Sequence, residues 1–110
     1  MSTVNQNLRS TEFNKKVWQA LKKIPRGRVT TYKEIVRYLD RPGAARAVGN
    51  ACGKNPDAPR TPCHRVVKSD GRLGGYAGGL KKKITLLKKE GIKMEKGKVE
   101  EFKKKIYRFK

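Results

Sequence analysis

Apolar residues near the start of the chain recur at spacings of three and four. This period is typical of an amphipathic helix, and it predicts a first helix over residues 11–23 that ends at Pro25 and Gly27. The apolar positions of this segment are Phe13, Val17, Ala20, Leu21 and Ile24. Residues 1–10 are polar, and we expect them to form a flexible N-terminus.

The next segment has the pattern of two short helices joined by a tight turn. After an extended piece at residues 28–30, Thr31 and Glu34 have the spacing of a capping box that begins a helix. Its apolar side consists of Ile35, Val36 and Leu39. A turn at residues 40–43 leads into a third helix over residues 43–52, which Gly53 caps. This arrangement predicts a helix-turn-helix.

The second half of the chain alternates loops with short regular segments. Residues 54–62 contain three prolines and form a loop, and residues 63–68 (CHRVVK) are expected to form a strand or its end. The glycine-rich loop at residues 74–79 lacks the Lys-Ser/Thr ending of a phosphate-binding loop, which argues against a nucleotide site. Leu80, Ile84 and Leu87 then predict a helix that Gly91 ends.

The tail, residues 92–110, is basic and has two interpretations. Its apolar positions Val99, Phe102, Ile106 and Phe109 have helical spacing, whereas its lysines are equally typical of a solvated charged surface. We therefore divide the chain into a flexible N-terminus (1–10), one folded domain (11–91) and a basic C-terminal tail (92–110). The predicted fold class is mainly α with short strands, in the form of a winged-helix-like helix-turn-helix domain that binds DNA.

The charge of the chain is strongly one-sided. In 110 residues, 29 are Lys or Arg and 9 are Asp or Glu, which gives a net charge of +20 at pH 7. Such a surface attracts polyanions, and nucleic acid is the expected partner. Acidic lipid would also attract it, but the chain has no amphipathic helix rich in Trp, Phe and Leu. A thermophilic composition would bring Glu together with Lys, and Glu is scarce here.

Targeting signals and membrane spans are not evident in the sequence. No apolar stretch approaches the roughly 20 residues that a transmembrane helix needs, and residues 1–10 have no apolar leader segment. We expect the protein in the cytoplasm, where the two cysteines, Cys52 and Cys63, stay reduced.

The third predicted helix has an unusual face. Arg46, Gly49, Asn50 and Gly53 fall at helical spacing, so one long cation stands among small residues. Small residues allow close approach to DNA, and Arg46 can reach beyond the surface. The alanines of the same segment can equally serve tight helix packing, on a different face.

Cys63 is the strongest candidate for chemistry. His64, the single histidine of the chain, follows it directly, and a thiol beside a titratable base suggests a nucleophile. Neighbours on a strand point to opposite faces, so the pair must sit at a bend or communicate through water. A buried structural cysteine is the alternative. A zinc site would need a fourth ligand besides Cys52, Cys63 and His64, and no paired ligand spacing supplies one.

Five ordered motifs resemble those of O6-alkylguanine-DNA alkyltransferases. The most specific is the run Pro62-Cys63-His64-Arg65-Val66-Val67, followed by Gly75-Tyr76-Ala77-Gly78-Gly79-Leu80. The others are Thr31-Tyr32, Ala45-Arg46-Ala47-Val48-Gly49, Lys54-Asn55-Pro56 and Leu86-Leu87-Lys88-Lys89-Glu90-Gly91. The resemblance spans residues 11–91.

This resemblance implies DNA repair by a single, irreversible alkyl transfer per molecule, without a cofactor. Cys63 would accept the alkyl group from O6 of guanine. His64, acting through a water and oriented by Glu90, would deprotonate the thiol. Cys52, on the third helix, is expected to lie away from this base.

The resemblance also implies how the substrate is bound. Tyr76 would hydrogen-bond the guanine ring, the carbonyls of Cys63 and Val66 would accept from its exocyclic amine, and the N–H of Ala77 would face O6. Asn55 would brace the turn that leads to the active-site loop.

The expected partner is double-stranded DNA that contains O6-alkylguanine, bound through its minor groove by a monomer, with no membrane and no metal. Arg46 would enter the base stack as the lesion flips out, and Tyr32 would press on the neighbouring phosphate. Gly49 and Asn50 would share this DNA-binding face.

Two features depart from the family pattern. About ten residues precede the first predicted helix, where alkyltransferases commonly carry another domain; alkyltransferase-like proteins, which bind alkylated DNA without repairing it, have a similar length but typically replace the acceptor cysteine. The retained Cys63 favours repair, with a damage sensor as the alternative. A plain helix-turn-helix regulator would leave the PCHRV motif and Glu90 unexplained. The basic tail is the second departure.

Overall fold

A computed structural model describes residues 2–109. The helices of this part are α1 (Ser2–Leu21), α2 (Tyr32–Leu39), α3 (Ala45–Gly53), α4 (Leu80–Lys89) and α5 (Phe102–Lys105), with a 3-10 turn η1 (Cys63–Arg65). The strands are β1 (Thr30–Thr31), β2 (Val66–Val67), β3 (Met94–Glu95) and β4 (Lys98–Val99). The fold is dominated by helices with a few short strands, which confirms the predicted class.

The first helix begins earlier than its apolar spacing indicated. We expected it to begin near Thr11, but the backbone is helical from Ser2 onward. The prediction was wrong at this boundary because residues 2–10 are mostly polar, and their two apolar positions, Val4 and Leu8, are too few to establish a helical period. The proposal that residues 1–10 are flexible rests on their composition alone.

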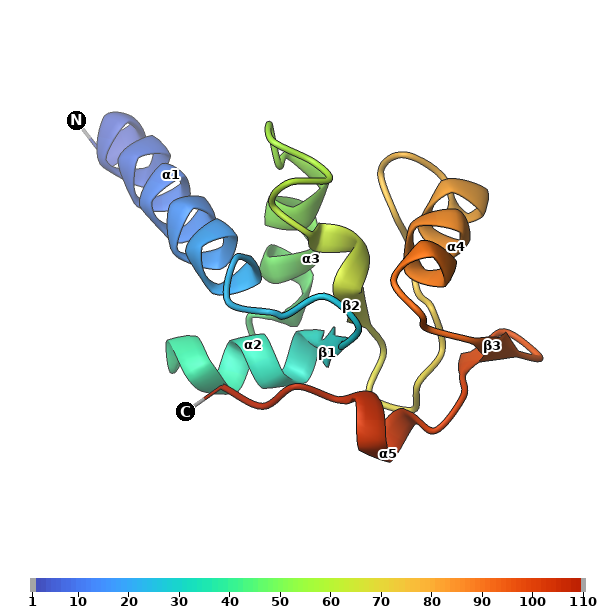
Figure 1. Ribbon diagram of the computed structural model, residues 1–110. Helices are drawn as coiled ribbons and strands as arrows, with labels where there is room; N and C mark the ends of the chain where they lie inside the picture. The colour runs from blue at the N-terminus through green and yellow to red at the C-terminus, as the bar shows by residue number, and fades with distance from the viewer. Residues whose placement is uncertain (1, 110) are drawn as a thin grey trace.

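The helix-turn-helix consists of α2 and α3; in Figure 1, α3 lies near the centre of the view and α2 lies below it, at the lower left. Thr31 caps α2, since its hydroxyl accepts a hydrogen bond from the Glu34 amide at 3.0 Å. The second half of the expected capping box is replaced, because the Glu34 carboxylate binds Arg37 and Arg108 instead. Asp40 ends α2 in the left-handed conformation at φ 54°.

Two short strand pairs tie distant parts of the chain together. β1 runs parallel to β2, with Thr30 opposite Val66 and Thr31 opposite Val67, so the residue that caps α2 is held beside the segment that follows Cys63. The predicted strand over residues 63–68 is therefore confirmed only at Val66–Val67, because residues 63–65 turn as η1. β3 and β4 form an antiparallel hairpin.

The tail is ordered within the described residues but is not the continuous helix its spacing suggested. Lys96 and Glu101 both adopt φ 53°, a left-handed conformation that interrupts a helix. Of the apolar positions that suggested a helix, Val99 lies in β4 and Phe102 begins α5. Ile106 is extended and forms a β-bridge with Val29. In Figure 1 the segment after α5 runs alongside α2.

The buried apolar residues form two clusters. The first joins α1, α2 and α3 with Cys63 and Val66, and Phe109 of the tail packs into it against Tyr38, with ring centroids 4.6 Å apart. The second joins α4 and the hairpin through Val29, Val67, Leu73, Leu87, Ile92 and Val99. Because Val99 and Phe109 are buried, the tail is not simply a solvated charged surface. None of the helices in residues 2–109 has the length and apolarity to span a membrane.

Candidate active site

Cys63 lies in the wall of a small cavity between α3, η1 and the glycine-rich loop. The cavity has a volume of about 270 Å³, and its wall is formed by Tyr32, Gly49, Cys52, Gly53, Cys63, Gly75, Tyr76 and Ala77. Cys63 itself is 5% exposed, and its amide donates to the Thr61 carbonyl at 2.9 Å. Any group that reacts with this thiol must therefore enter the cavity.

His64 and Glu90 are paired behind Cys63. Nε2 of His64 lies 3.0 Å from Oε2 of Glu90, although the two residues stand on η1 and at the C-terminal cap of α4. Arg65 holds the same carboxylate at both oxygens, with Nε to Oε1 at 2.9 Å and Nη2 to Oε2 at 2.7 Å. Its Nη1 donates to the carbonyl of Ile24 at 2.8 Å. This two-point grip fixes the carboxylate plane that orients the imidazole.

The protonation states suit His64 as a proton acceptor. Burial lowers the pKa of His64 below 6.5, and this effect outweighs the hydrogen bond and charge of Glu90, which act in the opposite direction. Burial alone would raise the pKa of Glu90, but the hydrogen bonds and charges of Arg65 and His64 lower it. The pair is thus a neutral imidazole beside a carboxylate. With Nε2–H donating to Glu90, Nδ1 keeps a lone pair, and in the described residues this buried atom has no partner.

Tyr76 closes the cavity from the glycine-rich loop. Its ring meets the His64 ring edge-on, with centroids 6.5 Å apart. Gly78 allows this position, because a Cβ there would lie 2.8 Å from the Tyr76 ring. Ala77 follows in the same wall. Burial, with a contribution from the charge of a Cys63 thiolate, raises the pKa of Tyr76, so its hydroxyl remains a donor.

The two carbonyls expected to face a guanine amine already have partners in the protein. The carbonyl of Cys63 accepts from the Val66 amide, and that of Val66 accepts from Nζ of Lys83 at 2.7 Å. A carbonyl oxygen has two lone pairs, so each can still accept a second hydrogen bond. Val66 itself is not part of the cavity wall.

Tyr32 and Cys52 lie closer to the cavity than the sequence suggested. Tyr32, which we placed at a DNA phosphate, is half-buried and its side chain contributes to the cavity wall. Cys52 is on α3 as predicted, but it lines the same cavity as Cys63. Burial and the neighbouring Cys63 charge raise the pKa of Cys52 to about 12, so it is a protonated thiol.

Asn55, for which we predicted a bracing role, is hydrogen-bonded within its own loop. Its Nδ2 donates to the Thr61 carbonyl at 2.7 Å, and its Oδ1 accepts from the Asp57 amide at 3.0 Å. These bonds fold the loop between α3 and η1 onto itself, two residues before Cys63. Asn55 is absent from the cavity wall.

The DNA-binding residues predicted on α3 share an exposed side of that helix. Arg46 and Asn50 are exposed, and Gly49, one turn from Arg46, reaches the cavity edge. Among residues 11–109, no ion-pair partner is found for Arg46. The indole of Trp18 donates to the Ala51 carbonyl at 2.8 Å, which anchors the opposite side of α3 to α1.

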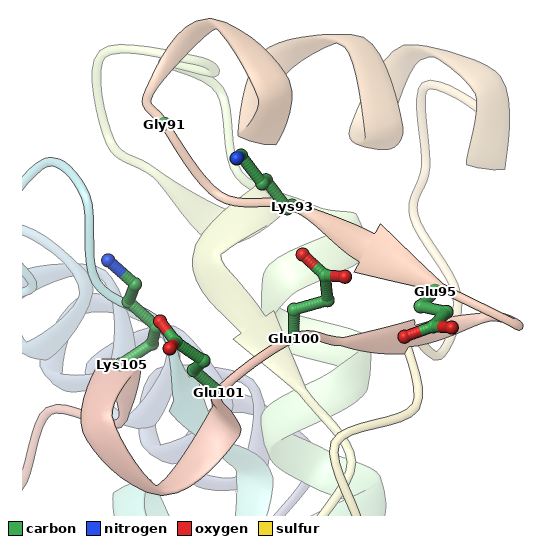
Figure 2. Close-up of a pocket in the computed structure, with 6 residues that line it drawn as sticks. All are labelled: Gly91, Lys93, Glu95, Glu100, Glu101 and Lys105. Atoms are coloured by element: carbon green, nitrogen blue, oxygen red, sulfur yellow. The ribbon is translucent and has the colours of Figure 1, made fainter.

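A second, larger hollow lies beside the C-terminal hairpin (Figure 2). It measures about 560 Å³, and charged residues dominate its wall: Lys93, Glu95, Glu100, Glu101 and Lys105, with Gly91. Most of these side chains are exposed, and apart from Gly91, which ends the motif at residues 86–91, none belongs to the motifs shared with the alkyltransferases. In the part of the chain that the structure describes, no three of His, Cys, Asp and Glu are grouped to hold a metal ion.

Arg65 and Lys83 hold this site together, but the sequence did not lead us to predict either of them as a site residue. Arg65 stands inside the PCHRV motif, and its place beside the only histidine was an available signal. Lys83 is fully buried, but it is the last of three consecutive lysines that look like a solvated helix face.

The amino-acid sequence matches a known protein family. Residues 12–92 match the family model described as 6-O-methylguanine DNA methyltransferase, DNA binding domain. A methylated-DNA--protein-cysteine methyltransferase of Mycolicibacterium paratuberculosis is 51% identical over 84 residues, which cover 76% of this chain and 51% of that protein. The chain thus spans about half the length of the curated relatives it matches.

Solved structures of similar proteins support the same family assignment. The crystal structure of Mycobacterium tuberculosis OGT in complex with DNA has a TM-score of 0.70 at 49% identity, covering 72% of this chain and 48% of that one. S. pombe Atl1, solved with damaged DNA containing O6-carboxymethylguanine, has a TM-score of 0.79 at 31% identity, covering 90% of this chain and 97% of its own. The chain therefore belongs to the 6-O-methylguanine DNA methyltransferase family.

Proposed function

We propose that this protein repairs DNA by transferring an alkyl group from O6 of guanine to Cys63, once per molecule and without a cofactor. The observation that carries the proposal is the buried His64–Glu90 pair, gripped by Arg65, directly behind a cysteine that lines a cavity. A nucleophile, a base and a group that orients the base are the elements of an activated thiol.

In the proposed reaction, His64 takes the proton of the Cys63 thiol through a water. The sulfur then attacks the alkyl carbon, so that an S–C bond forms while the bond between that carbon and O6 breaks. The electron pair of the broken bond remains on the purine, which Tyr76 stabilises by donating a hydrogen bond. The product thioether is stable, which explains why the protein would act only once.

Double-stranded DNA is the proposed partner. The net charge of +20 supplies phosphate affinity, and two similar proteins were solved with DNA. Because Cys63 is only 5% exposed, a guanine within a base stack cannot reach it and must flip into the cavity. Arg46, exposed one turn from the cavity edge, is placed to fill the gap that the base leaves. We propose that the monomer acts in the cytoplasm, where Cys63 stays reduced.

A damage sensor is the second candidate, and one observation favours it. The match to Atl1 covers 90% of this chain at a TM-score of 0.79, whereas the match to M. tuberculosis OGT covers 72% at a TM-score of 0.70. A sensor needs the cavity and the flipping residues but no nucleophile. The presence of Cys63 beside His64 and Glu90 is the reason we favour transfer.

Intact-mass measurement separates the two candidates. After incubation with a methylated duplex, the wild-type protein should gain about 14 Da, the mass of a methyl group replacing a hydrogen. Peptide mapping should place the group on Cys63 and not on Cys52, whose pKa of about 12 keeps it a thiol. The variant Cys63→Ala should bind the same duplex without gaining mass. Tight binding by an unmodified wild-type protein would establish the sensor.

A further inference from the structure

Lys83, on the first turns of α4, is a buried charge that the proposed mechanism does not use. Its side chain is 0% exposed, which is exceptional for lysine. Nζ donates to three backbone carbonyls, those of Val66 at 2.7 Å, Gly75 at 3.1 Å and Leu73. An ammonium group has three N–H donors, so every donor of this lysine has a partner.

The three carbonyls belong to the two chain segments that hold the reacting groups. Val66 directly follows η1, which carries Cys63 and His64. Leu73 and Gly75 lead into the glycine-rich loop, and Gly75 precedes Tyr76 in the cavity wall. One side chain of α4 thus joins the segment of the nucleophile to the loop that closes the cavity, while the opposite end of α4 supplies Glu90.

The hydrogen bonds require the protonated form of Lys83. A neutral amine has two N–H donors and one lone pair, and the lone pair would face a carbonyl oxygen. The groups whose charges act on Lys83 are Cys52 from α3 and Cys63 from η1, and Lys83 in turn acts on His64. Burial lowers the pKa of Lys83 to about 8, and a negative charge on either sulfur would act in the opposite direction.

We propose that Lys83 is a positioning residue, whose ammonium clamps the Cys63 segment to the Tyr76 loop and so sets the spacing between nucleophile and bound purine. This inference rests on the proposed function, because the spacing matters for a base in the cavity. Displacement of reacting groups by about 1 Å can slow a reaction about 10²-fold. Lys83→Met keeps the apolar stem but removes all three donors, so it should slow transfer by about 10²-fold.

The test uses single-turnover transfer from a methylated duplex across about pH 6.5 to 9.5. The wild-type rate should fall above about pH 8 as the clamp loses its proton, and Lys83→Met should be slow with no such fall. Lys83→Arg, whose guanidinium stays charged, should keep its rate at alkaline pH. Lys81→Met removes an exposed lysine from the same helix and should follow the wild type.

Each outcome has a definite meaning. A Lys83→Met rate equal to that of the wild type overturns the clamp. If Lys83→Met does not fold, a wild-type rate that stays level or rises through about pH 9.5 overturns it. If the wild type transfers nothing at any pH, the proposed function fails instead, and measured affinities for methylated and unmodified duplex then test the clamp.

In that binding test, Lys83→Met should lose the preference for methylated over unmodified duplex while retaining affinity for both through phosphate contacts. An unchanged preference overturns the clamp.

Discussion

The hollow at Cys63 and the hollow beside the C-terminal hairpin differ in size and in what their walls contain. The hollow beside the hairpin is about twice as large, 560 Å³ against 270 Å³, and its glutamates and lysines stand largely in solvent. The cavity at Cys63 is small, but the groups behind it are buried and each is held by a named partner. Solvent screens exposed charges, whereas burial and fixed hydrogen bonds shift the pKa values of His64 and Glu90. Volume alone therefore does not identify the reactive site.

The sharpest test of this contrast compares the Glu90 carboxylate, behind the Cys63 cavity, with the Glu100 carboxylate in the wall of the larger hollow. Glu90→Gln and His64→Ala should each slow methyl transfer by about 10²–10⁴-fold, the usual contribution of a general base. Affinity for duplex DNA should change little, because neither side chain is on the exposed face of α3. Single-turnover rates with a methylated oligonucleotide provide the measurement.

Glu100→Gln is the matched control, since it makes the same chemical change in the larger hollow. It should transfer at the wild-type rate. Equal losses for Glu90→Gln and Glu100→Gln would contradict the difference that we draw between the two hollows.

A second prediction separates the cavity from the surface of α3. Arg46→Ala should slow transfer from duplex DNA by about tenfold, a small part of the few kcal/mol that unstacking a base costs. Its reaction with the free base O6-benzylguanine should stay unchanged, because no stack is opened. Tyr32 lines the cavity, so Tyr32→Ala should slow both reactions. If Arg46→Ala slows both equally, Arg46 supports the fold or the cavity rather than flipping.

The smallest effect concerns pH. Because burial lowers the pKa of His64, the folded protein should keep the neutral base at pH 6.5, where a free imidazole is half protonated. The transfer rate should therefore change little between about pH 7.5 and about pH 6.5. A rate that has fallen by about half at pH 6.5 would show an ordinary, solvated histidine.

The same shift has a consequence for stability. Below pH 6.5 the unfolded chain binds a proton at His64 that the folded protein does not yet bind. The free energy of unfolding therefore decreases as pH falls below that value. Urea unfolding at about pH 7.5 and 5.5 gives the free energy of unfolding of the wild type and of His64→Asn, which has no imidazole. Between these two pH values, the wild type should lose more free energy of unfolding than His64→Asn does.

Residues 11–91 were largely predictable because local signals and tertiary packing agree there. The cap at Thr31 and the period of Leu80, Ile84 and Leu87 each encode a helix boundary or face. The predicted cap at Gly53 was wrong by one residue, because Gly53 is still helical and Lys54 caps α3. The tail was different, since its apolar spacing matched a helix. Gly97, in the hairpin turn beside Lys96, was an available signal against a continuous helix, whereas no glycine marks the left-handed conformation at Glu101.

Within the site, the sequence identified residues but not their spatial neighbours. The pairing of His64 with Glu90 came from the resemblance, and the structure places their side chains 3.0 Å apart. The Arg65 grip and the Lys83 clamp depend on where α4 lies relative to η1. No periodicity encodes that distance, and a lysine in a basic run gives no sign that it is buried.

The two-residue ladder between β1 and β2 links the helix-turn-helix to the segment that carries Cys63. Thr31 both pairs with Val67 and caps α2, while Val66, opposite Thr30, is held by the Lys83 side chain. A slip of this register by one residue would turn Val66 and Val67 to the opposite faces. The ladder therefore ties the helix-turn-helix to the nucleophile segment, and in the proposed complex the placement of α2 and α3 on a duplex would also set where the thiol lies. All four residues of this ladder are at most 4% exposed, so a larger side chain on either strand would have to displace its neighbours.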